Sequence, residues 1–197
     1  MIKRAFDICA SFFGLILISP ALLAIAIAIK RDSPGPVFYR GERIGKNGRP
    51  FKIFKFRTMV VNADSIGPSS TAADDTRITK VGRFIRNKYQ LDEFPQLINV
   101  LKGDMSLVGP RPQVPWAVEL YTTEEKETIL SVRPGMTDWA SVKFPNEGEI
   151  LLGSKDPDKD YLEKIAPEKT RLQIEYVKNH SFMVDLNILA KTFLTMR

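Results

Sequence analysis

Two adjacent carboxylates, Asp92 and Glu93, stand immediately before an apolar run in the segment LDEFPQLINVL. Pro95 follows closely, and proline is tolerated only in the first turn of a helix, because it lacks an N–H and clashes with the preceding turn. The pattern therefore predicts a helix that has Asp92 near its N-cap and stops at Gly103. On this pattern alone, both carboxylates could simply cap and stabilise the start of the helix.

Cationic segments on both sides of this pair favour a functional role for the two carboxylates over a role as helix caps. A basic stretch from Thr76 to Arg86 precedes the pair, and Arg111 follows it between Pro110 and Pro112. An arginine between two prolines has a restricted backbone, so presenting its guanidinium costs little entropy. Because arginine also binds phosphate groups bidentately, Arg111 is a candidate phosphate ligand. The alternative is a rigid turn with an arginine that faces solvent.

Carboxylates between cations suit a divalent cation that is bound together with a phosphorylated substrate. Mg²⁺ is commonly held by one or two carboxylates and the substrate phosphates, and the N–H groups of a helix start help to bind the anion. A carboxylate can also act as the nucleophile in phosphoryl transfer, which gives an acyl phosphate. The sequence has no Walker A motif, no G-x-G-x-x-G and no H-E-x-x-H, which excludes those routes to nucleotide or metal chemistry.

Composition narrows the class of protein. A chain of 197 residues suits one domain with a real core, and its net charge of +6 predicts an anionic partner. Cys9 is the one cysteine, which excludes an internal disulfide and is consistent with a reducing compartment. His180 is the one histidine, so a histidine-based metal cluster or a Ser-His-Asp triad is not expected.

A long apolar segment near the N-terminus predicts membrane insertion. No charged residue occurs from Ile8 to Ile29, and basic residues flank this run on both sides. As a straight helix it would be about 33 Å long, enough to cross a hydrocarbon core of about 30 Å. Three arrangements remain open: a cleaved signal peptide, a spanning helix, and a re-entrant helix that enters and turns back. We favour the re-entrant helix, because both flanks are positive and Ser19-Pro20 could break the run near its middle.

A strongly basic hairpin is expected next, at about residues 36–58. Residues 30–57 contain nine basic and two acidic side chains, a net charge of +7 against +6 for the whole chain. Two strands are predicted around an Asn47-Gly48 turn, the strongest short hairpin signal. Beside an apolar segment, this charge favours contact with membrane or substrate phosphates over a merely solvated face. Alternating basic and aromatic residues also occur in nucleic-acid sites, but the adjoining apolar run and the near-neutral remainder of the chain argue against that partner.

The remaining segments predict scaffold and surface elements. Val61 to Asp75 is polar and is expected to be a mobile surface loop. The later part of the chain predicts two helices, a lid-like or loop region, and an amphipathic end that docks on the core or on the membrane. These are, in order, helices at 119–132 and 167–180, the loop at 146–160, and the stripe Leu186, Leu189, Phe193 and Met196.

Several linked motifs resemble one known family. In chain order they are KRxFD, the apolar run with Ser-Pro, GERIGKNG, KFRTM, LDEFPQL, GDMSLVGPRP and RPGMT. Together they cover residues 1 to about 140 and are similar to the bacterial sugar transferases, the monotopic polyprenyl-phosphate phosphoglycosyl transferases. The resemblance implies an enzyme of the bacterial inner membrane, with its catalytic domain facing the cytoplasm, that starts the assembly of a membrane glycan.

The resemblance also implies a reaction and roles for residues. A nucleotide-diphosphate sugar, usually a UDP-sugar, would give its sugar-1-phosphate to undecaprenyl phosphate and release UMP, in a ping-pong reaction that requires Mg²⁺. By motif, Asp92 would be the nucleophile and carry the phospho-sugar. Glu93 would be its partner in the dyad and help either to activate the lipid phosphate or to hold the metal, and Arg111 would hold phosphate. The family's re-entrant helix, broken at Ser-Pro, matches Ser19 and Pro20, and a homodimer stays open.

One position departs from the family pattern. Family members often place an arginine five residues before the nucleophile, whereas Arg86 stands six before Asp92 and Asn87 occupies the fifth place. Either the loop holds one extra residue or Lys88 takes the role of that arginine. Within the KFRTM motif, Lys55 and Arg57 are further candidates to bind the nucleotide or membrane phosphate.

We therefore predict a mainly helical α+β protein, with a re-entrant membrane helix at residues 1–31 and a compact catalytic domain with amphipathic surface helices at 32–197. The main rival is a non-catalytic module that binds anionic lipids through the same apolar anchor and basic hairpin. A second rival is an exported protein with a cleaved signal peptide. Which sugar and which nucleotide the enzyme uses do not follow from the sequence.

Overall fold

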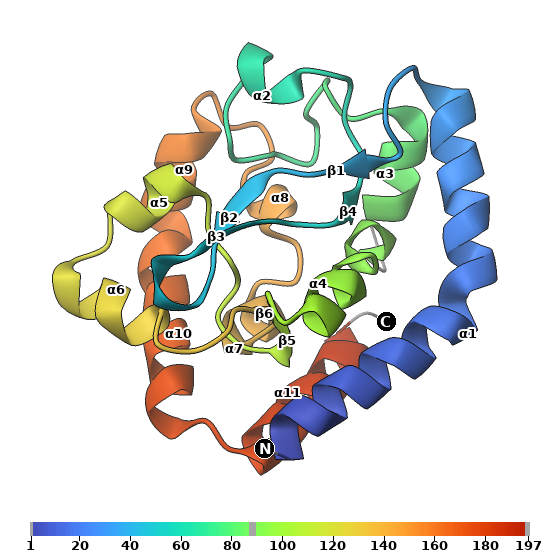
Figure 1. Ribbon diagram of the computed structural model, residues 1–197. Coiled ribbons are helices and arrows are strands. Elements are labelled where there is room, and N and C mark those ends of the chain that lie inside the picture. The colour runs from blue at the N-terminus through green and yellow to red at the C-terminus, as the bar shows by residue number, and fades with distance from the viewer. Residues whose placement is uncertain (1, 87–89, 196–197) are drawn as a thin grey trace.

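The computed structural model describes residues 2–86 and 90–195, and it begins with one long apolar helix. This helix, α1 (Ile2–Asp32), is 31 residues long and changes direction about midway along its length (Figure 1). Its mean hydropathy reaches 2.6 over an 18-residue window, so it is long and apolar enough to enter a membrane. Pro20 lies inside the helix and cannot bond the Ile16 carbonyl; the Ser19 hydroxyl donates to that oxygen instead, at 2.8 Å. The expected break at Ser19-Pro20 is therefore a bend within a continuous helix.

Both ends of α1 pack against the rest of the molecule. Near the N-terminus, Arg4 donates to the carbonyls of Val100 and Leu101, at 2.7 and 3.2 Å. Near the C-terminus, Ile29 is 2% exposed and packs with Phe56 and Ile85. Between these contacts, large apolar side chains are exposed, among them Phe12, Phe13, Ile16, Leu17 and Leu23.

The basic segment after α1 forms the predicted hairpin, in two short ladders. The strands β1 (Phe38–Tyr39) and β4 (Lys55–Phe56) pair antiparallel, and β2 (Glu42–Ile44) pairs antiparallel with β3 (Pro50–Lys52). Asn47 and Gly48 both have positive φ, at 57° and 74°, in the turn η1 (Lys46–Gly48), as the Asn-Gly signal predicts. The second of the two predicted strands is split between β3 and β4.

The segment from Val61 to Asp75 is held in place rather than left free, and it contains the short helix α2 (Ala63–Ile66). The buried Arg77 donates to the carbonyls of Ala63 and Pro68 and forms an ion pair with Asp75. This pairing lowers the pKa of the Asp75 carboxyl below its ordinary value. A short helix, α3 (Lys80–Arg86), follows and packs on α1.

The predicted helix at the carboxylate pair begins later than expected. Leu91–Glu93 form a 3-10 turn, η2, and α4 (Gln96–Lys102) starts after Pro95. Gly103 ends α4 with φ at 90°, which confirms the predicted stop. The helix α4 packs against α1.

Two parallel strands and a set of short helices complete the fold. The strands β5 (Ser106–Val108) and β6 (Gly135–Thr137) pair in parallel, and a Cβ at Gly135 would collide with the Gly109 backbone. Figure 1 shows the late helices gathered mainly on the side of the molecule away from α1, except α11, which lies beside the N-terminal half of α1. These helices are α5 (Pro115–Glu119), α6 (Thr123–Ile129), α7 (Trp139–Lys143), α8 (Glu147–Ile150), α9 (Pro157–Lys164), α10 (Ala166–Asn179) and α11 (Phe182–Thr195).

Three expectations for this region change. The helix expected over 119–132 is in fact α6, which starts at Thr123 because Thr122 and Glu125 form a capping box. The segment expected to be a loop at 146–160 contains α8 and the start of α9. In α11, Ile188 rather than the predicted stripe is fully buried, and Phe193 is 71% exposed; Met196 lies outside the described residues. The helix expected over 167–180 is confirmed as α10.

Candidate active site

The turn η2 brings Asp92 to the interior of the molecule. Leu91 packs against the cluster of Ile29, Phe56 and Ile85, and Gln90 takes a left-handed conformation with φ at 44°. As a result Asp92 is only 1% exposed. Its side chain makes no capping bond to α4, so the interpretation of Asp92 as a helix cap is wrong.

Asp92 carries a carboxylate with free acceptor positions. Among the described residues, neither of its oxygens has a hydrogen-bond partner, although both are buried. The Lys55 ammonium lies 3.0 Å from Oδ2 as an ion pair, but it is not aligned for a hydrogen bond. Burying a carboxylate in this way is costly, which is typical of a group whose partner arrives with the substrate.

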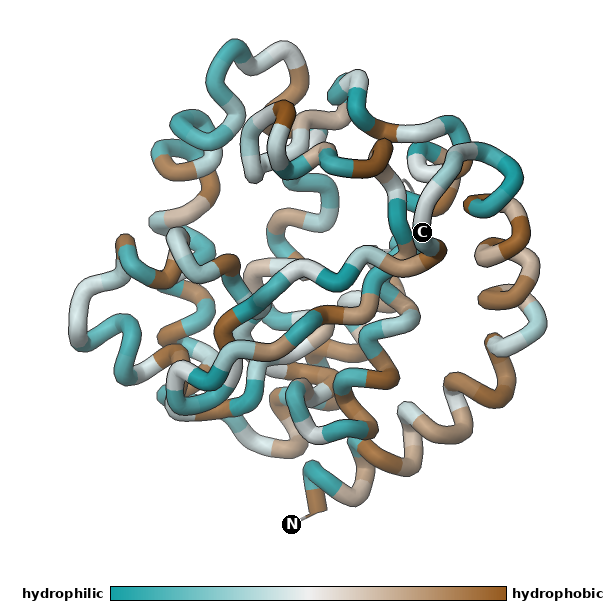
Figure 2. The backbone as a smooth tube through the Cα atoms, turned by 45° about the horizontal axis from the view of Figure 1, so that its top comes forward, coloured by the Kyte–Doolittle hydropathy of each residue, from teal (hydrophilic) through white to brown (hydrophobic). Residues whose placement is uncertain are grey.

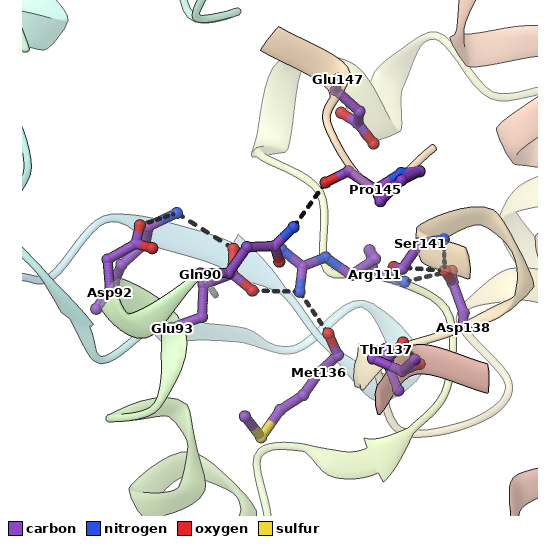
Figure 3. Close-up of polar contacts among 12 residues, drawn as sticks. Gln90, Asp92, Glu93, Arg111, Met136, Thr137, Asp138, Ser141, Pro145 and Glu147 are labelled. Atoms are coloured by element: carbon purple, nitrogen blue, oxygen red, sulfur yellow. Dashed lines mark hydrogen bonds and ion pairs between the residues drawn. The ribbon is translucent and has the colours of Figure 1, made fainter. Parts of the chain in front are cut away.

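Glu93 has the opposite environment. Arg111 donates to both of its carboxylate oxygens at 2.6 Å, and Lys55 donates to Oε1 at 3.2 Å. Figure 3 shows the Glu93 and Arg111 side chains pointing toward each other, with Asp92 beyond Glu93. Burial acts to raise the pKa of Glu93, but Arg111 and then Lys55 outweigh it and hold this pKa far below its ordinary value.

The backbone and a buried carboxylate fix Arg111. Its guanidinium also donates to the Met136 carbonyl, and its backbone N–H donates to Asp138 Oδ2 at 3.2 Å. Asp138 is fully buried and caps α7 through Ser141. Burial acts to lower the pKa of Arg111, but the charge of Glu93 raises it above the ordinary value, so the guanidinium is permanently charged.

Parallel pairing explains why Arg111 and Asp138 meet. Arg111 follows β5 and Asp138 follows β6, and the carboxyl ends of parallel strands lie at the same edge of a sheet. Sequence reasoning missed Asp138. The D-x-x-S spacing from Asp138 to Ser141 is a capping pattern that could have indicated its position, although not its contact with Arg111.

A buried amide holds Lys55 beside the carboxylates. Asn99, which is 0% exposed in α4, accepts a hydrogen bond from the Phe54 N–H at 2.7 Å and donates to the Lys52 carbonyl at 3.0 Å. These bonds tie the returning strand of the hairpin to the helix that follows η2. Nothing in the local sequence pattern indicates this role for Asn99, because its partners are far away in the chain.

A cavity of about 770 Å³ adjoins the carboxylate pair, a size that suits a nucleotide-sized ligand. Lys55 lines the cavity and also contacts Asp92, so the two sites meet at this residue. Several cations and polar groups line the rest of its wall. Among the residues predicted from sequence, the wall includes Lys55, Arg57, Arg86 and Pro112.

The predicted phosphate ligands are not equally available. The Arg57 guanidinium is 6% exposed and donates to the Pro36 carbonyl and to Ser33, so it fastens the chain that leaves α1. Arg86 ends α3 on the cavity wall, whereas its proposed substitute Lys88 lies outside the described residues. Pro110 accepts a hydrogen bond from the Gly135 N–H and thereby holds the PRP segment on β6.

Binding of a magnesium ion at the carboxylate pair would require additional ligands from the substrate phosphates. Within the described residues, no group of three or more His, Cys, Asp or Glu side chains is placed to bind a metal ion. The buried, unpartnered oxygens of Asp92 nevertheless provide hard ligands beside Glu93. This donor set fits an ion that is shared with substrate phosphates, and it does not fit an ion held by the protein alone.

Comparison with known proteins gives the family. A family model described as bacterial sugar transferase matches residues 1–197. The chain belongs to the bacterial sugar transferase family. It is 39% identical to a UDP-N-acetylgalactosamine-undecaprenyl-phosphate N-acetylgalactosaminephosphotransferase of Aeromonas hydrophila, over 99% of this chain and 43% of that protein.

Two further relatives agree with this family. The chain is 40% identical to a UDP-glucose:undecaprenyl-phosphate glucose-1-phosphate transferase of Escherichia coli, over 98% of this chain and 39% of that protein. It is also 40% identical to an uncharacterized sugar transferase, EpsL, of Bacillus subtilis, over 98% of this chain and 85% of that protein. The chain thus spans about two fifths of the length of the first two of these relatives.

Proposed function

We propose that this bacterial sugar transferase is a phosphoglycosyl transferase that moves a sugar-1-phosphate from a UDP-sugar to undecaprenyl phosphate. The names of the curated relatives supply these substrate classes. The observation that carries the mechanism is the contrast within the dyad. Asp92 keeps both oxygens free of hydrogen bonds, whereas Glu93 is engaged by Arg111 and Lys55.

In the first step, a carboxylate oxygen of Asp92 attacks the β-phosphorus of the donor. The new bond joins Asp92 to phosphorus, the bond from phosphorus to the bridging oxygen breaks, and UMP leaves with that electron pair. Because a carboxylate and a phosphate repel each other, the attack needs nearby positive charge. Lys55, at 3.0 Å from Asp92, supplies part of it.

In the second step, a phosphate oxygen of undecaprenyl phosphate attacks the same phosphorus. The aspartyl–phosphorus bond breaks, the lipid receives the sugar-1-phosphate, and the Asp92 carboxylate is restored. Glu93 fixes the two cations of the site throughout, since it binds Arg111 with both oxygens and Lys55 with one. With Glu93 as the fixed anion between them, both cations stay directed toward the reacting phosphate.

Mg²⁺ is the proposed cofactor, and Asp92 and Glu93 are the residues that would hold it together with the donor phosphates. When bound, the ion would neutralise charge on the phosphates as the nucleophile approaches. To serve as a ligand, Glu93 would use its remaining acceptor position and keep its contacts with Arg111 and Lys55. Chelation of divalent ions is expected to stop release of UMP, and added Mg²⁺ should restore it; unchanged turnover in chelator would contradict this proposal.

The proposed membrane arrangement is a re-entrant helix at residues 1–31 and a cytoplasmic catalytic domain at 32–197. It is supported by contacts of both ends of α1 with one folded unit, through Arg4 to α4 and through Ile29 to β4 and α3. A straight helix of 31 residues would be about 46 Å long and would carry its two ends to opposite faces of a bilayer. In this arrangement the exposed apolar surface of α1 faces lipid, near the expected position of the polyprenyl phosphate.

The test is a search for the covalent intermediate. We expect wild-type protein, incubated with a UDP-sugar and no lipid acceptor, to gain the mass of one sugar phosphate. Asp92→Asn should gain none, and the control Asp74→Asn, at an exposed aspartate, should match the wild type. No mass gain in the wild type under turnover conditions, or a label on another residue, would overturn the mechanism. Absence of both label and UMP release would favour a lipid-binding module without chemistry.

A further inference from the structure

A buried ion pair lies on the cavity wall and is not used by the mechanism above. Lys169 of α10 is 7% exposed, and its ammonium donates to Glu147 Oε1 of α8 at 2.6 Å. Both residues line the same 770 Å³ cavity as Lys55. The face of the Tyr161 ring lies 5.3 Å from the ammonium and completes this part of the wall.

The pair keeps hydrogen-bonding capacity for a ligand. An ammonium has three donors, and within the described residues only one of those of Lys169 is used. The second oxygen of Glu147 likewise has no hydrogen bond among these residues, and the side chain is 33% exposed. The cavity wall therefore offers both donors and an acceptor at one place.

The position of Glu147 is fixed by the fold. The Ala73 N–H donates to the Gly148 carbonyl at 2.9 Å, and Leu151, directly after α8, packs against Ala72 and Ile165. The charge of Glu147 also acts on Arg111: it is one of the charges, after Glu93 and Asp138, that raise the pKa of Arg111 against the effect of burial. The pair therefore lies within electrostatic reach of the arginine that faces the dyad.

The chemistry of the pair distinguishes it from the rest of the cavity. Arginines such as Arg40, Arg43 and Arg86 line the wall as cations suited to phosphate groups. Glu147, in contrast, would repel a phosphate, and it neutralises the charge of Lys169. A neutral group with both hydroxyl donors and hydroxyl acceptors matches such a pair.

We propose that Glu147 and Lys169 bind the hydroxyl groups of the sugar and thereby select the donor. Glu147 accepts hydrogen bonds from sugar hydroxyls, and Lys169 donates to their oxygens or to an acyl substituent. This inference rests on the proposed function, because that function supplies the UDP-sugar as the occupant of the cavity. A site built to hydrogen-bond a hydroxyl discriminates strongly against an analogue that leaves its polar groups unpaired.

The experiment compares ligands with and without the sugar. The probes are UDP, UDP-glucose, UDP-galactose, UDP-N-acetylglucosamine and UDP-N-acetylgalactosamine, with binding measured by calorimetry and phospho-sugar formation by mass spectrometry. With Glu147→Gln, we expect kcat/KM for the preferred donor to fall about 10- to 100-fold, as for loss of a hydrogen bond to a charged group, and the ranking of the donors to change. The affinity for UDP should stay within about twofold.

A matched control is available in a neighbouring ion pair. Glu168→Gln changes a pair of the same length, Lys143 to Glu168 at 2.6 Å, which does not line the cavity. It should leave both the donor ranking and the UDP affinity unchanged. Lys169→Met is the second variant, and unchanged UDP affinity in either variant shows that the site is folded.

Two outcomes would overturn the inference. One is an equal loss of affinity for UDP and for UDP-sugars in Glu147→Gln, which indicates a structural or nucleotide-binding role. The other is an unchanged donor ranking with normal kcat/KM. Failure of the proposed function looks different, because wild-type protein would then form no Asp92-linked phospho-sugar with any donor.

Discussion

At the scale of single residues, two neighbouring carboxylates have different environments and so are suited to different tasks. Asp92 is buried next to one ammonium without a hydrogen bond, while Glu93 is bound on both oxygens by Arg111. Pairs of titratable groups whose environments diverge commonly divide a reaction between them. In the proposed mechanism, Asp92 accordingly attacks phosphorus and Glu93 positions the cations.

The fork geometry of Arg111 gives a first prediction. Arg111→Lys keeps the charge but loses the bidentate contact with Glu93, because an ammonium cannot reproduce the planar pair of donors. We expect the rate of phospho-sugar formation to fall about 10- to 100-fold in single-turnover measurements. Arg133→Lys is the control: this exposed arginine donates to the Gly103 carbonyl, and the rate of the variant should not change. Equal rates in the two variants would contradict the role given to Arg111.

The depressed pKa of Glu93 gives a second prediction, on the dependence of stability on pH. A carboxyl whose pKa is lower in the folded state contributes stability that is fully present above its unfolded value, near 4.5, and is lost as pH falls through the folded value. The difference in free energy of unfolding between wild type and Glu93→Gln should therefore be constant between about pH 5 and 8 and shrink in more acidic solution. Denaturant titrations at several pH values measure it. A difference that changes around neutral pH would show that Glu93 titrates there.

At the scale of elements, the N-terminal half of α1 is fastened to the domain by polar groups rather than by apolar packing alone. Asp7 is 3% exposed and accepts hydrogen bonds from the Ser106 hydroxyl at 2.9 Å and from the Leu107 N–H at 3.2 Å. Lys3 donates to Asp185 of α11, which also accepts a bond from the buried Tyr176. The helix α1, the strand β5 and the helix α11 thus share one polar network.

This network predicts that the substitution Asp7→Asn destabilises the folded protein. Asp7→Asn replaces one acceptor oxygen by an N–H₂ group, which leaves a donor at Ser106 or Leu107 without its partner. We expect destabilisation by about 1–3 kcal/mol, seen as a lower Tm in detergent. The same substitution at the exposed Asp74 should change stability by no more than about 0.5 kcal/mol. Equal Tm values for the two variants would mean that the network contributes little.

At the scale of the whole molecule, α1 carries more of the exposed large apolar side chains than any other described element. Figure 2 shows hydrophobic residues along most of α1, whereas the rest of the chain alternates between polar and apolar segments. Because both ends of α1 contact the same folded unit, the exposed apolar part between them is the surface available to a membrane. The geometry favours a helix that enters the bilayer and returns.

The proposed topology predicts which side of the membrane each end faces. In a Cys9→Ser background, Ile2→Cys and Arg31→Cys should both react with a membrane-impermeant maleimide in inside-out vesicles and not in intact cells. Asp74→Cys reports the side of the catalytic domain and should behave in the same way. Labelling of positions 2 and 31 from opposite sides would establish a spanning helix instead. An intact N-terminus, measured by mass spectrometry of the membrane-extracted protein, would exclude a cleaved signal peptide.

The sequence by itself determined the features that depend on near neighbours. The turn at Asn47-Gly48 and the stop at Gly103 follow from backbone conformations that few residues adopt, and the apolar helix follows from composition. The family and the dyad of Asp92 and Glu93 could also be recognised from the sequence, because short motifs of fixed spacing identify them.

Only the tertiary structure decided what each of these side chains contacts. Arg57 and Arg111 are both candidate phosphate ligands in the sequence, yet one holds Ser33 and the other holds Glu93. Asp92 proved not to be a helix cap, and the cavity pair of Glu147 and Lys169 had no signal in the sequence. The physical reason is that these roles depend on partners distant in the chain, and burial and charge at a site are set by the packing of several elements at once.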